Sequence, residues 1–226
     1  NIDEFKYDID HDLTEMKTIK LLENSLLTVY TSHMIEHLTN EQVQFLFDDV
    51  YRMLCTDGVF RITCPDIDLL YNELIENNNN ELNIGTYTEM IPSAYEKFIH
   101  QISTYFAKWW ILKDKELVDS DIYNDFLNLK KIDEKEFKNL ILKYGKYGAF
   151  EYLRLESEKY FDKFKYHLTG LHINWFNKHK IINFLINSGF RKIFIRKKNN
   201  SIIDDYKSKD FDYNSPQLSL YIEAVK

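Results

Sequence analysis

Three residues near the start of the sequence have side chains that suit proton transfer. They are His33, Glu36 and His37, separated only by Met34 and Ile35. An imidazole titrates near neutrality and a neighbouring carboxylate can shift that titration, so either histidine is a candidate general base. We predict catalytic roles for His37, His33 and Glu36. The alternative is that Glu36 and His37 fix the loop through hydrogen bonds to the backbone.

The same side chains could instead bind a divalent metal ion. Two imidazoles and a carboxylate suit zinc, iron or manganese, and His167 or His172 would be available as a further ligand. The preferred interpretation assigns no metal and leaves this alternative open.

The residues before this group have the pattern of a β-strand. Residues 26–30 form a short apolar run rich in β-forming side chains, and it ends in the polar residues Thr31, Ser32 and His33. This pattern is typical of a buried parallel strand that ends at the carboxyl edge of a sheet. Ligands of open α/β sheets bind at that edge.

A helix and a second strand are expected next. Thr39 and Gln42 have the spacing of a capping box, and the apolar residues that follow recur at helical spacing as far as Leu54. Gly58 is expected to supply a positive φ where the chain turns, and residues 59–64 have strand composition. The sequence therefore predicts a strand-helix-strand crossover, the unit of a parallel sheet.

In combination these features resemble the class I S-adenosylmethionine-dependent methyltransferases. The C-terminal end of the chain resembles a group of short predicted methyltransferases often linked to glycan and surface-polysaccharide synthesis. The residues that carry the resemblance are Ile35-Glu36-His37-Leu38, Arg52-Met53-Leu54, Cys55-Thr56-Asp57-Gly58, Pro65-Asp66, His172-Ile173-Asn174-Trp175, Ser188-Gly189-Phe190, Phe211-Asp212, Pro216 and Ser219-Leu220-Tyr221-Ile222-Glu223-Ala224.

The resemblance implies an α/β fold: a doubly wound, Rossmann-like methyltransferase sheet with an antiparallel last strand and a helical insertion. Residues 1–76 and 166–226 would form the methyltransferase core, without its first strand and glycine-rich loop. Residues 77–165 would form a mostly helical insertion, acting as a substrate lid or a homodimer surface. The implied activity is methyl transfer from S-adenosylmethionine to a hydroxyl or amine of a small molecule or glycan.

The resemblance also implies which residues contact the cofactor. Asp3 would bind the ribose hydroxyls, and Asp12 with Leu13 would lie beside the adenine, although Asp10 could take the place of Asp12. Ser32, at the end of the predicted strand, completes this set.

Three further residues are predicted on the substrate side. They are His172, Asn174 and Trp175. Capping and packing at a helix start is the alternative role for them.

The glycine-rich turn that normally holds this cofactor is not found in the sequence. Glycine occurs at positions 58, 85, 145, 148, 170 and 189, and no pair of these makes such a loop. We expect the segment that carries it to precede Asn1. The alternative is a non-catalytic methyltransferase-like scaffold or regulatory subunit.

Composition limits the remaining classes. A formal net charge of −7 over 226 residues disfavours nucleic-acid binding, which needs a basic face. No apolar run is long enough to span a bilayer. The two cysteines, Cys55 and Cys64, are expected to be reduced packing residues of a cytoplasmic protein.

Overall fold

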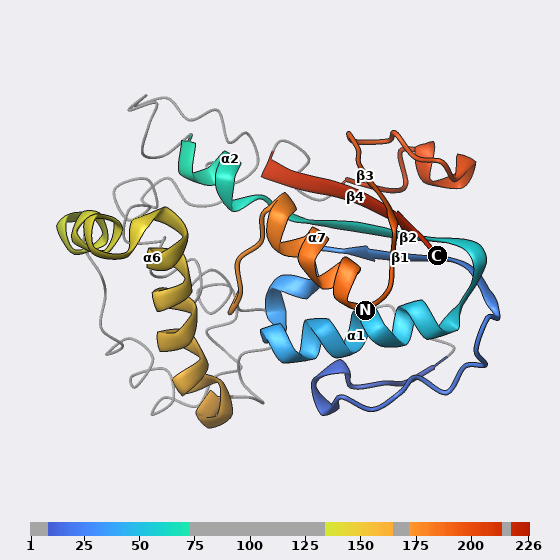
Figure 1. Cartoon of the computed structure of the whole chain (residues 1–226), viewed down its shortest axis with the longest axis horizontal. Helices are drawn as coiled ribbons and strands as arrows, with labels where there is room; N and C mark the ends of the chain where they lie inside the picture. The colour runs from blue at the N-terminus through green and yellow to red at the C-terminus, as the bar shows by residue number, and fades with distance from the viewer. Residues whose placement is uncertain (1–8, 73–133, 165–171, 214–217) are drawn as a thin grey trace, which may run out of the picture.

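The computed structural model describes residues 9–72, 134–164, 172–213 and 218–226. Within these residues four strands form one mixed sheet in the order β1-β2-β4-β3. The strands are β1 (Leu26–Ser32), β2 (Leu54–Pro65), β3 (Lys192–Ile195) and β4 (Ser219–Val225). β1 runs parallel to β2, and β4 runs antiparallel to both β2 and β3 (Figure 1).

The predicted fold class is wrong, since this small mixed sheet is not a doubly wound methyltransferase sheet. One reason lies in residues 9–25, which contain a 3-10 turn, η1 (Leu13–Glu15), and no strand. The backbone of this segment binds side chains of a helix instead of a neighbouring strand. The Ile19 amide donates to Asp49 (2.9 Å), and the Ile19 carbonyl accepts from Arg52 (3.0 Å).

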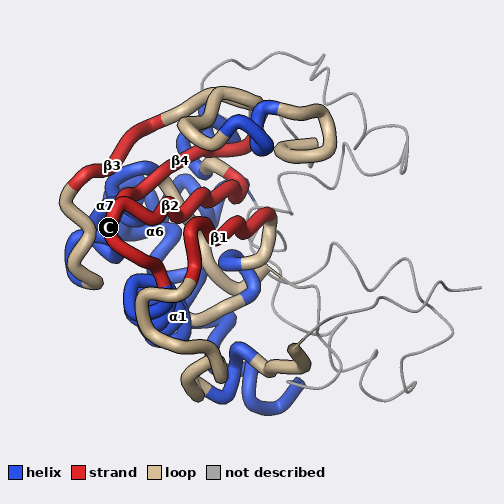
Figure 2. The backbone as a smooth tube through the Cα atoms, turned by 90° about the vertical axis from the view of Figure 1, so that its right-hand side faces the viewer, coloured by secondary structure: helices blue, strands red, loops and turns tan. Residues whose placement is uncertain are grey.

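The second reason is that the two faces of the sheet are covered differently. In the described residues, helices cover one face, and the irregular segment 196–213 with its 3-10 turn η4 (Asp204–Lys207) covers the other (Figure 2). That face carries Arg61 of β2, whose guanidinium is fully buried and pairs with Asp212 and Glu223. A polar, charged face needs polar partners, which the irregular segment supplies and an apolar helix stripe would not.

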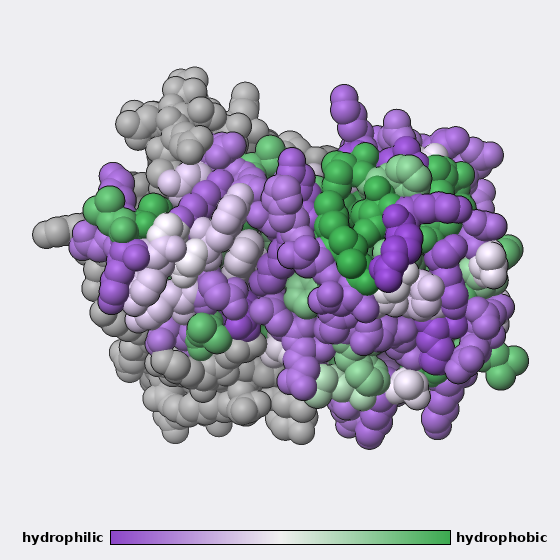
Figure 3. Space-filling model, in the orientation of Figure 1, coloured by the Kyte–Doolittle hydropathy of each residue, from purple (hydrophilic) through white to green (hydrophobic). Residues whose placement is uncertain are grey.

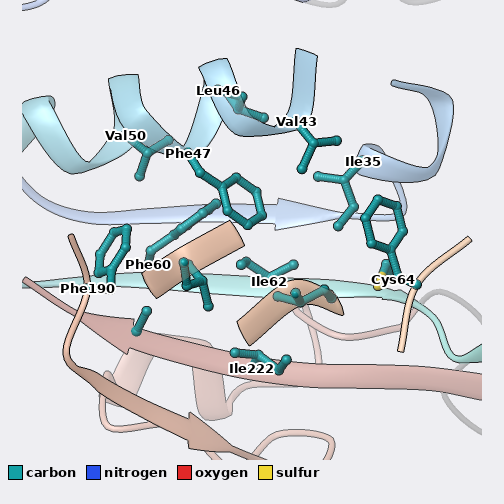
Figure 4. Packing of buried hydrophobic residues seen from close by; sticks show 14 of the residues in the cluster. Ile35, Val43, Leu46, Phe47, Val50, Phe60, Ile62, Cys64, Phe190 and Ile222 are labelled. Atoms are coloured by element: carbon teal, nitrogen blue, oxygen red, sulfur yellow. The ribbon is translucent and has the colours of Figure 1, made fainter. Parts of the chain in front are cut away.

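The helix after β1 has the predicted boundaries. α1 (Asn40–Met53) begins at Thr39, and both hydrogen bonds of the Thr39–Gln42 capping box are present, so this prediction is confirmed. Its apolar stripe packs on the inner face of β2, where the rings of Phe47 and Phe60 meet edge to face at 5.1 Å (Figure 4). Burial of this stripe is the main stabilising contribution to the crossover.

The turn predicted at residues 55–58 lies inside β2, where the pairing with β1 is irregular. The positive φ falls on Asp57 (59°), and Gly58 has no positive φ. A Cβ atom at Gly58 would lie 2.8 Å from the carbonyl oxygen of Cys55. Glycine is therefore required here for close backbone approach and not for a left-handed conformation.

A second helix, α7 (Lys178–Asn187), packs beside α1 on the same face of the sheet. The Asn177 side chain caps its first turn by accepting from the Lys180 amide (2.9 Å). Gly189 follows with φ 111°, and a Cβ there would lie 2.9 Å from the ring of Tyr51. Only glycine satisfies both the conformation and the contact.

A smaller apolar cluster lies outside the sheet. α6 (Glu134–Phe164) is bent at Gly145 (φ 73°) and buries Phe137, Phe150 and Leu153 against Trp175. It also meets the short helix α2 (Ile67–Tyr71) through Ile67. Residues 77–133 of the predicted insertion lie outside the described residues, so its role as a lid or dimer surface stays a prediction.

The surface is polar apart from a few apolar areas. Figure 3 shows one such area over β3, where Phe194 and Ile195 are exposed. β1 is less buried than the sequence indicates, because Leu27 is 78% exposed. Within the described residues, no helix has the length and apolar character needed to cross a membrane.

Candidate functional site

The candidate site lies where β1 and β2 end together. Ser32 and Thr63 form the last pair of the parallel ladder, and the His33 amide extends it by donating to the Thr63 carbonyl (2.9 Å). His33 then adopts a left-handed conformation (φ 48°), which turns the chain out of the strand. The 3-10 turn η2 (Ile35–His37) follows, so Glu36 and His37 lie at the carboxyl edge of the two strands.

The turn binds a segment from the far end of the chain. The Glu36 carbonyl accepts hydrogen bonds from the amides of Ile173 (2.9 Å) and Asn174 (3.0 Å). His172 is thereby placed beside the turn, with its Nε2 3.7 Å from the Glu36 Oε1 and its ring 4.8 Å from that of His37. The structure therefore brings together His33, Glu36, His37 and His172.

Glu36 is the most unusual residue of this cluster. Its side chain is 1% exposed, and neither carboxylate oxygen accepts a hydrogen bond from another described residue. Burial raises the pKa of Glu36 to about 8, because a charged carboxylate loses its hydration there. Burial also lowers the pKa of His172 well below its usual value, with smaller contributions from His37 and His33. The lowered pKa favours the neutral imidazole of His172, which is the form that binds a metal ion.

Ser219 and Glu36 both contact His33. Its Nε2 lies 2.8 Å from the Ser219 hydroxyl at the start of β4, and its Nδ1 lies 3.5 Å from the Glu36 Oε1. Sequence reasoning did not identify Ser219 as a site residue. Its position follows from the register of β4, in which Ser219 lies opposite Pro65, and no local sequence pattern indicates that register.

Two of the predicted substrate-side residues are used in packing. The Asn174 amide donates to the Leu38 carbonyl (3.0 Å) and to the Asn40 side chain (3.0 Å). The buried Trp175 ring stacks on Tyr147, with ring centroids 5.8 Å apart. His172 is the member of the predicted substrate set that joins the cluster.

The predicted cofactor residues Asp12, Leu13 and Ser32 each contact a different part of the structure. Asp12 is exposed and caps η1 by accepting from the Thr14 amide (2.8 Å), whereas Leu13 packs against the main core. The Ser32 hydroxyl accepts from Thr63 (2.9 Å). Asp3 and the alternative metal ligand His167 lie outside the described residues.

The turn that holds Asp12 is linked to the helix that follows the cluster. The Gln42 side chain donates to the Thr14 carbonyl (3.1 Å) and accepts from the Thr39 amide (2.9 Å). Asp12 and the Glu36–His37 turn therefore border the same end of α1.

Comparison with known proteins identifies no family. No family model matches the chain, and no curated protein matches it. A solved structure described as a possible exported protein from Bordetella parapertussis aligns with 8% identity and a TM-score of 0.36. The alignment covers 96% of this chain and 42% of that protein, so the chain spans less than half of its length. A likeness this weak carries no argument about fold or function.

Proposed function

We propose that the protein transfers a methyl group from S-adenosylmethionine to a hydroxyl or amine of a small molecule or glycan. The observation that carries the proposal is the cluster of Glu36 with His33, His37 and His172 at the carboxyl ends of two parallel strands. In open α/β sheets, ligands bind at the carboxyl ends of parallel strands. The methyltransferase-like motifs of the sequence support the same chemistry, and the proposal does not depend on the sheet that was predicted from them.

The residues near this edge fit the cofactor in part. Asp12 is exposed, so its carboxylate is accessible to polar groups of an adenosyl moiety, and Leu13 beside it is partly buried against the main core. The link through Gln42 keeps both residues at the end of α1 that adjoins Glu36 and His37. When bound, the cofactor supplies an electrophilic methyl carbon on a sulfonium.

The protein's own residues would align the acceptor and remove its proton. As the acceptor oxygen or nitrogen takes up the methyl group that the bound cofactor would supply, its proton would pass to an imidazole. His33 and His37 are the candidate bases. His33 is already oriented by Ser219, and its Nδ1 lies 3.5 Å from the Glu36 Oε1.

The cellular location that we propose is the cytoplasm. Cys55 and Cys64 are both free thiols, as expected of a protein in a reducing compartment.

Titration calorimetry with S-adenosylhomocysteine tests the proposal. We expect micromolar binding by the wild-type chain, and binding weaker by on the order of tenfold for Asp12→Asn, since a hydrogen bond to a charged group is lost. Asp210→Asn is the matched control, because Asp210 is an exposed carboxylate on segment 196–213, outside the predicted cofactor residues. Absence of binding by the wild type would favour a non-catalytic scaffold or regulatory subunit.

A further inference from the structure

The buried Glu36 carboxylate needs a partner that the described residues do not provide. A carboxylate removed from water is strongly destabilising unless hydrogen bonds or an opposite charge compensate for it. Neither Glu36 oxygen accepts a hydrogen bond from another described residue. In the described part of the chain, the basic groups within 4 Å of Glu36 are the imidazoles of His33 and His172, at 3.5 and 3.7 Å, and no lysine or arginine lies that close.

The surrounding groups form a ligand set. One ligand atom each from Glu36, His37 and His172 lie within 4.8 Å of one another. Zinc binds histidine nitrogen and carboxylate oxygen at about 2.0–2.2 Å, so these atoms would have to draw together by roughly 1 Å around an ion.

We propose that Glu36, His37 and His172 bind a divalent transition-metal ion of the zinc type. Two imidazoles and one carboxylate leave coordination positions open for water or a substrate oxygen, which is the arrangement of a catalytic and not of a purely structural site. The neutral imidazole of His172 can coordinate directly. The ion would also supply the positive charge that the Glu36 carboxylate lacks.

The residues around this set fit the role of outer partners. The Ser219 hydroxyl contacts the His33 Nε2, and the His33 Nδ1 faces the Glu36 carboxyl group. Ser219 and His33 would therefore orient Glu36, one of the three proposed ligands. The Glu36 backbone carbonyl fixes the segment that carries His172. Metal binding itself does not depend on methyl transfer. The role of the ion in orienting an acceptor oxygen rests on the proposed function, and it would leave His33 as the base.

Zinc binding to the purified chain tests the proposal. The protein is dialysed against EDTA, the chelator is removed, and zinc chloride is titrated by calorimetry. We expect one zinc ion per chain and a Kd in the micromolar range or below. Glu36→Gln and His172→Gln should each weaken binding by about tenfold or more, because each removes a ligand. His179→Gln is the matched control, since His179 is exposed on α7 away from the cluster, and it should bind as the wild type does.

Cobalt substitution gives a second measurement. Co²⁺ bound to imidazole and carboxylate ligands should give visible absorption bands that His179→Gln retains and Glu36→Gln loses. Circular dichroism shows whether each variant is folded, and His37→Gln replaces His172→Gln if the latter does not fold. The proposal is overturned if the folded wild type binds no zinc, or if Glu36→Gln binds it as tightly as the wild type.

The two proposals fail in different ways. A chain that binds S-adenosylhomocysteine but not zinc contradicts the metal site alone. A chain that binds zinc at Glu36 but no S-adenosylhomocysteine contradicts methyl transfer alone.

Discussion

The backbone and the side chain of Glu36 have different roles. Its carbonyl oxygen accepts two amide hydrogen bonds and so attaches the segment after residue 171 to the turn after β1. Its carboxylate is buried beside three imidazoles. A substitution that removes only the carboxylate charge therefore tests the site while the backbone attachment is kept.

Glu36→Gln should alter how the stability of the metal-free chain depends on pH. Burial raises the pKa of Glu36 to about 8 in the folded chain, whereas its ordinary pKa of 4.5 applies in the unfolded chain. When folding raises the pKa of a carboxyl group, the folded state loses stability as the pH rises from the pKa of the unfolded chain to that of the folded chain. Urea unfolding in EDTA should show that the free energy of unfolding of Glu36→Gln rises relative to that of the wild type between about pH 5 and pH 9. The difference should reach roughly 1–3 kcal/mol or more at the upper end.

The control for this measurement is Glu41→Gln, which changes an exposed carboxylate in the first turn of α1. Its effect should vary little over the same range. A difference between Glu36→Gln and the wild type that stays constant with pH would show that the Glu36 carboxylate is not buried as described.

At the scale of elements, alternate side chains of β2 lie in an apolar and in a charged environment. Phe60 and Ile62 face the helices, whereas Arg61 between them faces segment 196–213. The Arg61 guanidinium donates to Asp212 and to Glu223 (2.9 Å), and all three side chains are fully buried. This ion cluster fixes the irregular segment on a face that has no helix in the described residues.

Arg61→Met should destabilise the protein strongly. It leaves the buried Asp212 carboxylate without its cation and Glu223 with Arg196 alone, a loss of about 3–5 kcal/mol in the free energy of unfolding. Arg196→Met is the matched control, because Arg196 also binds Glu223 (2.8 Å) but its side chain is partly exposed. The control should cost no more than about 1 kcal/mol. Equal losses in urea unfolding would contradict a special role for the buried cluster.

The parts of the fold that the sequence predicts correctly are local. Helix α1 and its capping box depend on residues a few positions apart, and so do the strands at residues 59–64 and 219–224. The sheet as a whole was predicted wrongly, because strand pairing joins distant segments and residues 9–25 bind helix side chains instead of forming a strand. Asp212 and Glu223 were taken only as part of a family-like ending, since their partner Arg61 lies far away in the sequence.

The candidate site also contains residues that are close in the sequence and residues that come from distant segments. His33, Glu36 and His37 are neighbours in the sequence, so their grouping could be predicted from spacing alone. The approach of His172 and Ser219 depends on backbone hydrogen bonds and strand register between distant segments. Sequence spacing gives no measure of those contacts.

At the scale of the whole molecule, two apolar clusters meet at one short segment. The larger cluster lies between the sheet and helices α1 and α7, and the smaller one joins α6 and α2. Trp175 belongs to the smaller cluster and Phe176 to the larger, and the Phe176 carbonyl accepts from the Ile67 amide (2.9 Å). The segment that carries His172 is therefore adjacent to both clusters.

We expect α6 to open without unfolding of the sheet, because its cluster is small and has its own contacts. Phe150 is fully buried there, with ring centroids 5.8 Å from Phe137 and 6.0 Å from Trp175. Phe150→Ala should lower the free energy of hydrogen exchange in α6 by about 3–5 kcal/mol and change the amides of β2 and β4 much less.

Phe47→Ala is the matched control for this measurement, since Phe47 is equally buried but packs on the sheet. It should lower protection in β2, β4 and α1 together, because the loss falls on the cluster that those elements share. If Phe150→Ala instead lowers protection in the strands by the same amount as in α6, the two clusters unfold as one unit. The segment that carries His172 would then be held by the full stability of the protein, and opening of α6 could not give substrates access to the site.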